Sequence, residues 1–244
     1  MSRSDEALRT IRSNINERVY HLYIVTGGAV PRYAYTVGLS DAEIGAEVMF
    51  AGGMIYLARD VELIVSEAIR HLRLSGCSLA ESFRVERLGA FVMREVSECW
   101  VTKLALGALD YYEGRSIRML QIVPDEQHYT IDVPDMRRAL HDEELSAWHW
   151  LWKPWEFSVP ENATATTNID ALKGAVITEA VRWGAAEWEL FAGPGPEVEK
   201  ADIRVVPIGT LLANDPTLTP VVSLDVGKAL WRDQADLLWH VWGN

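Results

Sequence analysis

Apolar residues recur every three or four positions between Leu57 and Leu74, which is the spacing of one face of an amphipathic α-helix. Gly76 follows the last apolar position, where a residue with a left-handed backbone commonly ends a helix. The same spacing recurs from Trp100 to Tyr112 and is closed by Gly114. The pattern therefore predicts two main amphipathic helices.

Short runs rich in β-branched and aromatic residues predict strands before, between and after these helices. In the first part of the chain they span Val19 to Val25, Arg32 to Leu39, Glu47 to Ala51, Phe91 to Met93, Ile117 to Val123 and His128 to Val133. In the last part they span Val176 to Val181, Trp188 to Ala192, Ile203 to Val206 and Val221 to Leu224. We expect an α+β protein with a mixed or antiparallel sheet module that carries the two helices, followed by a smaller, mainly β module.

Charge and tryptophan content differ between the two parts of the chain. Up to Leu140 there are 16 basic and 19 acidic residues, whereas from His141 onward there are 7 basic and 16 acidic residues and nine of the ten tryptophans. This change favours a domain boundary in the same region. We expect an N-terminal α+β domain over residues 1–155 and a smaller acidic, tryptophan-rich module over residues 156–244.

Composition excludes several classes of partner. The net charge of −12 repels the phosphates of nucleic acids, and the longest basic run is Arg137-Arg138. No uncharged apolar run reaches the roughly 18 residues that cross a bilayer, and the amino terminus is polar. Cys77 and Cys99 are too few for a disulfide framework or an all-cysteine zinc site. We expect a cytoplasmic protein without nucleic-acid, membrane or metal partners, and the sequence leaves its cofactor and oligomeric state unknown.

The clearest polar constellation lies on the predicted strand from His128 to Val133. Strand alternation places His128, Thr130 and Asp132 on one face, and Asp135 follows closely. A histidine beside carboxylates can transfer protons, so His128, Asp132 and Asp135 are candidate catalytic residues of a hydrolase. Residues four apart on a strand lie about 13 Å apart, which is too far for His128 and Asp132 to bind one metal ion. The alternative is a half-exposed strand whose polar face meets solvent.

Four tryptophans gather between residues 148 and 155. Trp148 and Trp152 are four residues apart on one face of a predicted short helix, and Trp155 follows. Indole rings stack on ligands and anchor protein interfaces, so Trp148, Trp152 and Trp155 form a candidate surface for a small-molecule ligand or a protein partner. Packing of the same rings in the core is the alternative.

Three segments stand out by their pattern. They are Tyr33-Ala34-Tyr35-Thr36-Val37-Gly38-Leu39, the later Ala51-Gly52-Gly53, and Gln121-Ile122-Val123-Pro124-Asp125. Together they resemble the bacterial family DUF4262, a domain of unknown function, over roughly residues 18–155. The resemblance implies no particular activity, substrate or catalytic residue.

A second resemblance covers the C-terminal part. Trp188-Glu189-Leu190-Phe191-Ala192-Gly193, the segment from Ile203 to Leu212 and the pair Asp215-Pro216 are similar to the immunity-protein-related domain of unknown function twenty-one eighty-five. In that family an acidic residue usually follows the glycine, whereas Pro194 stands here. The two resemblances imply an interaction protein of immunity type, whose acidic, tryptophan-bearing surface covers a basic protein partner.

The strand with Tyr35 and Thr36 also suggests an enzyme. Its order relative to the next short strand is similar to that of the split-barrel flavin reductases, in which a strand with Thr or Ser lines the flavin site. This similarity would make Tyr35 and Thr36 binding residues for a flavin or another small molecule, although no phosphate-binding glycine motif accompanies them. The sequence thus leaves three hypotheses: an interaction protein, a flavin- or small-molecule-binding enzyme, and a hydrolase with a His/Asp pair.

Overall fold

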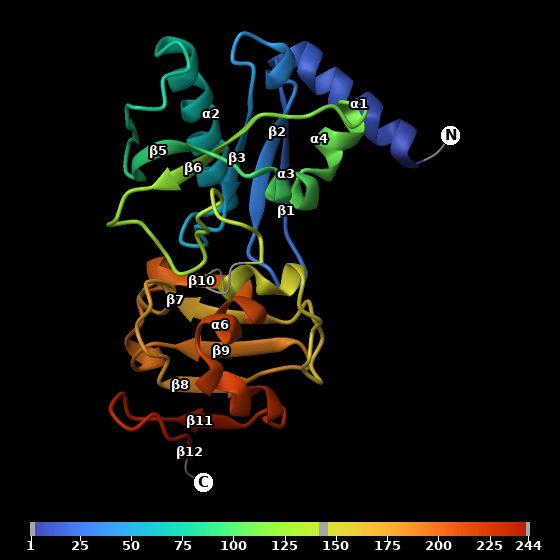
Figure 1. Ribbon diagram of the computed structural model, residues 1–244. Coiled ribbons are helices and arrows are strands. Elements are labelled where there is room, and N and C mark those ends of the chain that lie inside the picture. The colour runs from blue at the N-terminus through green and yellow to red at the C-terminus, as the bar shows by residue number, and fades with distance from the viewer. Residues whose placement is uncertain (1–2, 142–145, 243–244) are drawn as a thin grey trace. The chain divides into compact units, whose positions relative to one another are not determined.

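The computed structural model describes residues 3–141 and 146–242, and Figure 1 shows its helices and strands. Contacts divide the chain into two compact units. Unit 1 contains residues 3–25, 32–129 and 135–141, and unit 2 contains residues 26–31, 130–134 and 146–242. Each unit is built around its own six-stranded sheet, which confirms the predicted α+β class.

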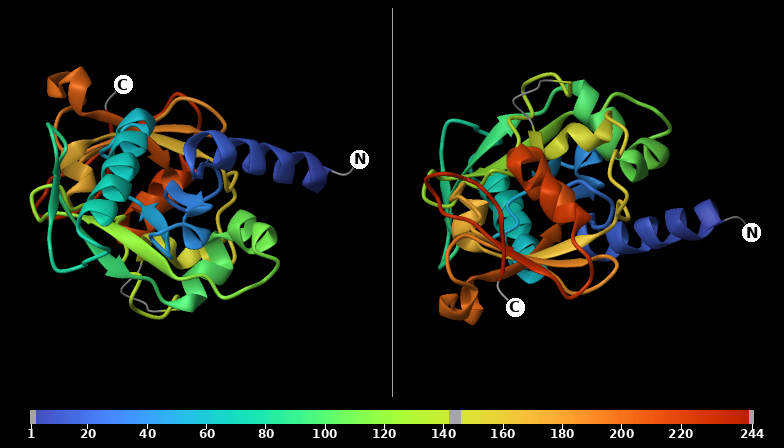
Figure 2. Two further views of the ribbon diagram at one scale, coloured as in Figure 1. Left: turned by 90° about the horizontal axis from the view of Figure 1, so that it is seen from above. Right: turned by 90° about the horizontal axis from the view of Figure 1, so that it is seen from below.

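Unit 1 contains sheet A and four helices. The strands are β1 (His21–Val25), β2 (Tyr33–Val37), β3 (Glu47–Ala51), β4 (Phe83–Val85), β5 (Gly89–Glu95) and β6 (Met119–Pro124). Their order is β1-β2-β3-β6-β5-β4, with β3 and β6 parallel and the other neighbours antiparallel. The helices are α1 (Arg3–Arg18), α2 (Ala58–Leu74), α3 (Glu98–Leu104) and α4 (Leu106–Tyr111), with a 3-10 turn η1 (Leu39–Asp41). Helix α2 packs against β3 and β4 and α4 packs against β2, on opposite sides of the sheet (Figure 2).

Helix α2 follows the predicted apolar spacing. Its buried face consists of Val61, Ile64, Val65, Ala68, Ile69 and Leu72. The Asp60 carboxylate accepts the N–H of Leu57 (2.8 Å), which satisfies a free donor at the start of the helix. Gly76 has a φ of +61°, the left-handed conformation expected after the last turn. The prediction of a helix up to Leu74 is confirmed.

The second predicted helix, Trp100–Tyr112, is two short helices that meet at Ala105. Ala105 has a ψ of 42°, which interrupts the helical backbone. The N–H of Gly107 donates to the hydroxyl of Tyr35 (3.1 Å), and a Cβ on Gly107 would lie 2.6 Å from the Tyr23 ring. The break between the two helices therefore coincides with the close approach of α4 to β1 and β2. The spacing of the apolar residues does not indicate this break.

Unit 2 contains sheet B. The strands are β7 (Thr164–Asn168), β8 (Glu179–Arg182), β9 (Glu187–Phe191), β10 (Ile203–Pro207), β11 (Ala229–Trp231) and β12 (His240–Val241). Their order is β10-β7-β9-β8-β11-β12, with β7 and β9 parallel and the other neighbours antiparallel. The helices are α5 (Ile169–Leu172) and α6 (Ile208–Asn214), and the 3-10 segments are η2 (Ser146–Leu151), η3 (Gly195–Glu197), η4 (Lys200–Asp202) and η5 (Pro216–Ser223). Figure 1 shows α6 in front of β7 and β9.

The strand predicted from Val221 to Leu224 is wrong, because most of this segment lies in the 3-10 helix η5. The side chain of Asp215 accepts the N–H of Thr217 (3.0 Å) and so starts the helical turn. Pro220 has no N–H to give to a sheet ladder. Capping and proline chemistry outweigh the β-branched composition here.

Residues 146–155 lie in unit 2, whereas the predicted boundary placed them in the N-terminal domain. The indole N–H of Trp150 donates to the carbonyl of Gly209 (3.0 Å), and the hydroxyl of Ser146 donates to the side chain of Asn214 (2.9 Å). Both partners lie in α6, so these hydrogen bonds join the segment to the second sheet.

Two short segments, residues 26–31 and 130–134, also belong to unit 2 although the residues around them belong to unit 1. The N–H of Ile131, for example, donates to the carbonyl of Leu172 (2.9 Å). The units are therefore not consecutive stretches of sequence, and a single boundary residue does not separate them.

Within residues 3–141 and 146–242, no helix is both long enough and apolar enough to cross a bilayer. Helix α2 has 17 residues, and the charged side chains of Arg59, Glu62, Arg70 and Arg73 are among those exposed on it.

Candidate functional site

Residues 128–135 form turns instead of the predicted strand. The Asp125 carboxylate accepts the N–H of His128 (3.1 Å), which closes a turn directly after β6. The N–H of Val133 donates to the carbonyl of Thr130 (3.1 Å), which forms a second turn. Side-chain alternation requires an extended backbone, so the predicted polar strand face does not form.

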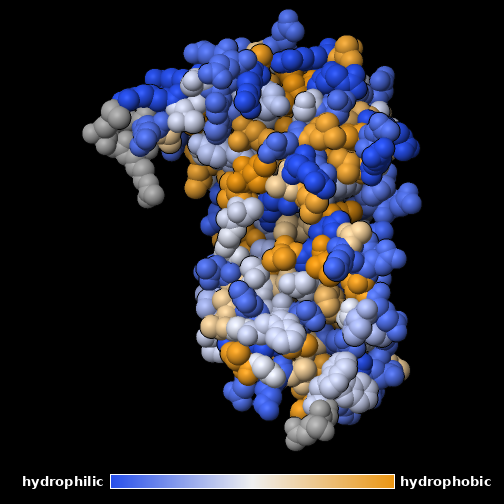
Figure 3. Space-filling view, turned by 180° about the vertical axis from the view of Figure 1, so that it is seen from behind, coloured by the Kyte–Doolittle hydropathy of each residue, from blue (hydrophilic) through white to orange (hydrophobic). Residues whose placement is uncertain are grey.

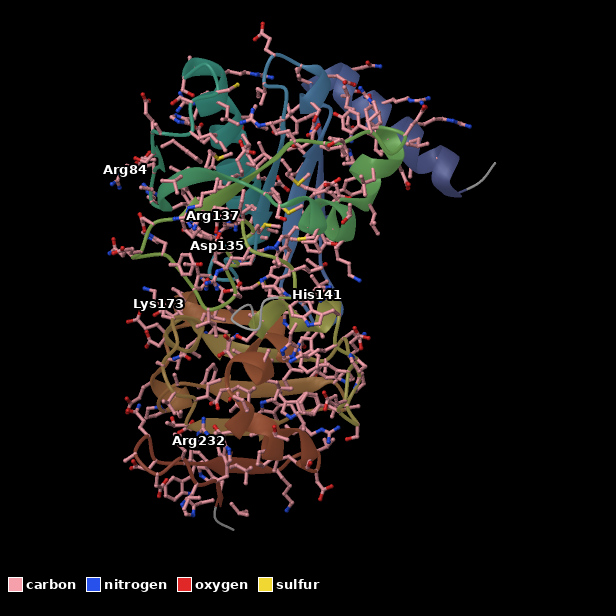
Figure 4. All side chains as sticks on the ribbon, in the orientation of Figure 1. Arg84, Asp135, Arg137, His141, Lys173 and Arg232 are labelled. Carbon is pink, nitrogen blue, oxygen red and sulfur yellow. The ribbon has the colours of Figure 1, made fainter. Side chains whose placement is uncertain are left out.

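The structure does not bring the three candidate catalytic residues together. His128 is paired with Asp125, with Nδ1 and Oδ1 2.6 Å apart. The Asp135 carboxylate accepts two hydrogen bonds from the Arg137 guanidinium (2.8 and 2.7 Å), which lower the pKa of Asp135 (Figure 4). Asp132 belongs to unit 2 and is fully buried. The carboxylate partner of His128 is thus Asp125, and its signal in the sequence is an Asp-x-x-His spacing at the end of a strand.

Tyr35 and Thr36, the residues expected to face a flavin, lie inside unit 1 with exposures of 3% and 0%. The Tyr35 ring stacks with the rings of Tyr23 and Tyr33, at centroid distances of 5.0 and 6.3 Å. The Thr36 hydroxyl donates to the carboxylate of Glu47 (2.6 Å). Neither side chain offers a surface to a flavin ring.

The buried carboxylate of Glu47 accounts for the Tyr-Thr-Val-Gly-Leu motif. It accepts four hydrogen bonds, from the hydroxyl of Thr36 (2.6 Å), the N–H of Gly38 (2.9 Å), the N–H of Ser40 (2.9 Å) and the hydroxyl of Tyr112 (2.5 Å). Gly38 has a φ of +118°, and a Cβ there would lie 2.9 Å from both the Ile15 side chain and the Val19 carbonyl. The motif therefore joins β2, β3 and the end of α4 inside unit 1.

The tryptophans between residues 148 and 155 contribute to the packing of unit 2. Their indole N–H groups donate to backbone carbonyls, from Trp148 to Asp132 (2.8 Å), from Trp150 to Gly209 (3.0 Å) and from Trp155 to Val159 (2.7 Å). Trp148 is 1% exposed, whereas Trp152 and Trp155 are half-buried. Trp148 is thus inaccessible to a ligand, and only parts of the Trp152 and Trp155 rings reach the surface.

A groove of about 570 Å³ lies on the open face of sheet B. The strand register aligns Thr166, Glu189, Val181 and Ala229 in one row across β7, β9, β8 and β11, and all four line the groove. The residue before Glu189 in β9, Trp188, points to the other face, where its indole donates to the Val221 carbonyl of η5 (3.4 Å). Helical segments therefore cover one face of the sheet, while the groove lies on the face seen from behind in Figure 3.

The groove combines exposed indole rings with carboxylates. Trp183 and Trp242 line it and are 59% and 47% exposed. Glu179 and Glu189 are the charged residues of the lining, and its described residues include no Lys or Arg. The groove was not predicted from the sequence, because the tryptophans between residues 148 and 155 form a denser cluster. The available signal was the Glu-Trp-Glu-Leu alternation of β9, which is typical of a sheet with one open face.

A second hollow in unit 2 adds to its negative character. It has a volume of about 620 Å³, and its charged lining residues are Asp170, Lys173, Glu197, Glu199 and Asp202 (Lys173 is labelled in Figure 4). Across the described parts of the chain, no group of three or more His, Cys, Asp or Glu residues is placed to hold a metal ion.

The fold and these sites define a two-unit α+β protein, with a motif-bearing first unit and a tryptophan-lined open sheet face in the second. Residues 14–129 match the model of the family described as Domain of unknown function (DUF4262), which confirms the resemblance of the N-terminal part. The match includes the Tyr33–Leu39 motif and ends before residue 130, so it does not bear on the immunity-related resemblance. Neither a curated protein nor a solved structure matches the chain.

Proposed function

We propose that this protein is a binding protein of immunity type, and that the groove on sheet B takes up a basic, partly apolar segment of a partner protein. The juxtaposition of Trp183 and Trp242 with Glu179 and Glu189 carries this proposal. An indole face and a carboxylate both attract a cation, while Val181 and the rings offer apolar surface to the stem of a Lys or Arg side chain.

The groove suits binding better than catalysis. Its described lining contains no His, the most frequent general base, and no Cys or Ser, two frequent nucleophiles. A volume of about 570 Å³ is enough for two or three side chains of a partner. The excess of 16 acidic over 7 basic residues from His141 onward would also attract a basic partner over distance and raise its association rate.

The test uses two labelled peptides, acetyl-(Lys-Leu)3-amide and acetyl-(Glu-Leu)3-amide, titrated with the full chain and followed by fluorescence anisotropy. We expect the basic peptide to bind more tightly than the acidic one. A cation over an indole contributes about 0.5 to 2 kcal/mol, so Trp183→Ala should raise the Kd of the basic peptide by about 2- to 30-fold. Raising the ionic strength from about 0.1 to 1 M, which shortens the Debye length from about 10 to 3 Å, should weaken the same complex.

The control separates the groove from the overall charge. Glu189→Lys reverses a charge in the groove, whereas Glu161→Lys makes the same change at an exposed position outside its lining. We expect Glu189→Lys to raise the Kd by roughly tenfold or more and Glu161→Lys to change it by less than about twofold. Equal effects of the two substitutions, or equal binding of the two peptides, would show that the groove is not the binding site.

A further inference from the structure

The imidazole of His128 in unit 1 is held in one orientation by its own loop. Its Nδ1 lies 2.6 Å from Oδ1 of Asp125, and because the carboxylate can only accept, Nδ1 carries the proton. The carboxylate also accepts the N–H groups of Ala90 (2.8 Å) and of His128 (3.1 Å). Partial burial disfavours ionisation of Asp125, but these hydrogen bonds and the His128 ring outweigh it and lower the pKa of Asp125.

Neighbouring groups restrict the plane of the ring. The Tyr56 ring stacks on the His128 ring, with centroids 6.4 Å apart and planes 23° apart. Tyr56 is itself anchored, because its hydroxyl donates to the carbonyl of Leu88 (2.9 Å). Gly89 approaches so closely that a Cβ there would lie 2.5 Å from Nδ1 of His128. The imidazole is therefore ordered before any ligand binds.

The other ring nitrogen, Nε2, remains available. No residue within 3–141 or 146–242 forms a hydrogen bond with it, and 28% of the His128 side chain is exposed. With the proton on Nδ1, Nε2 carries the basic lone pair. An exposed Nε2 behind a carboxylate-bound Nδ1 is the arrangement of the general base in hydrolytic triads and dyads.

We propose that His128 is the general base of a hydrolytic site in unit 1 and that Asp125 is its positioning residue; a small activated ester is the probe of this base. This site is independent of the groove on sheet B. It also differs from the pairing that the sequence suggested, because neither Asp132 nor Asp135 takes part.

The reaction at this site is hydrolysis by water. Nε2 of His128 accepts a proton from a water molecule while the water oxygen forms a bond to the ester carbonyl carbon. The resulting tetrahedral adduct breaks its bond to the alkoxy oxygen, which takes the proton from Nε2. Ester and water thus give carboxylic acid and alcohol, and His128 returns to its initial state.

The test measures hydrolysis of p-nitrophenyl acetate by the full chain. We expect His128→Gln to lower kcat/KM by roughly 10²-fold, which is the lower end of what a positioned general base contributes. We expect Asp125→Asn to lower kcat by about tenfold or more while KM stays within about twofold, because the ring loses its orientation but the substrate contacts remain. His240→Gln, at an exposed histidine in β12, should leave the rate unchanged.

Nitrogen chemical shifts of the histidine rings give a second readout that does not depend on a variant. We expect the neutral His128 ring of the wild type to carry its proton on Nδ1 and not on Nε2. Wild-type esterase activity in a folded His128→Gln variant, or a ring protonated on Nε2, would overturn the proposal. A role confined to loop structure predicts a lower melting temperature for His128→Gln with no change in ester hydrolysis, so that outcome overturns it as well.

Discussion

Glu47→Ala should destabilise unit 1 more than the loss of any exposed carboxylate, because four hydrogen-bond donors converge on this buried side chain. Two of them have alternatives. The N–H of Gly38 also lies 2.9 Å from the Tyr112 hydroxyl, and the Thr36 hydroxyl lies 3.5 Å from the Val48 carbonyl. The other two donors, the N–H of Ser40 and the Tyr112 hydroxyl, lose the acceptor that the structure gives them.

The magnitude follows from these two groups. A buried donor without an acceptor costs about 1 to 3 kcal/mol. Two such donors give about 2 to 6 kcal/mol, and we expect the free energy of unfolding to fall by about 3 to 5 kcal/mol. With a urea dependence of about 2 kcal/mol/M, the midpoint of the unit 1 transition should fall by roughly 1.5 to 2.5 M.

Urea unfolding followed by far-UV circular dichroism measures this change, and hydrogen exchange of peptides from β2 and β3 assigns it to unit 1. Glu43→Ala removes an exposed carboxyl four residues away and should change stability by less than about 0.5 kcal/mol. Equal midpoints for Glu47→Ala and Glu43→Ala would refute the reasoning.

Two other predictions concern the interior of unit 1. Gly38→Ala should destabilise unit 1 by several kcal/mol in the same urea assay, because φ is +118° and the added Cβ would lie 2.9 Å from Ile15 and from the Val19 carbonyl. Gly45→Ala is the control and should cost less, because Gly45 has a positive φ but open space around it. Burial raises the pKa of Tyr35, Tyr56 and Tyr112, assisted at Tyr112 by the charge of Glu47. Because the neutral phenol is favoured in the folded state, this stability is present below the ordinary tyrosine pKa near 10 and is lost as the pH rises above it. Absorbance at 295 nm should therefore show these tyrosines ionising only with alkaline unfolding, and a native titration curve that superimposes on the unfolded one would contradict this.

Local patterns predicted the elements whose stability is decided locally. The strand at Glu47–Ala51 has the predicted bounds, and α2 ends at the predicted Leu74, because apolar spacing, capping and a left-handed glycine act over a few residues. The same reasoning gave a wrong prediction for the segment after β6. The Asp125 side chain competes with extended backbone by accepting the N–H of His128, and period-two alternation carries no information about that competition.

The candidate sites show the same difference between what local patterns predict and what tertiary contacts determine. His128 was found from its residue type, but its partner Asp125 required the geometry of the turn. Thr36 was selected as a surface residue and is instead an interior donor, because burial depends on which helices cover a strand. The groove on sheet B gathers Trp183 and Glu189 from the β8–β9 hairpin and Trp242 from the segment after β12, and strand pairing brings the two parts together.

By itself, the sequence determined the α+β class, the main helix, most strands, the acidic and tryptophan-rich C-terminal part, and the resemblance to DUF4262. These properties depend on composition and on spacing over a few residues. The tertiary structure decided which carboxylate meets His128, why Thr36 and Gly38 surround Glu47, and which face of sheet B stays open. Those properties depend on contacts between residues far apart in the chain, such as Glu47 and Tyr112, whose approach is set by packing rather than by local spacing.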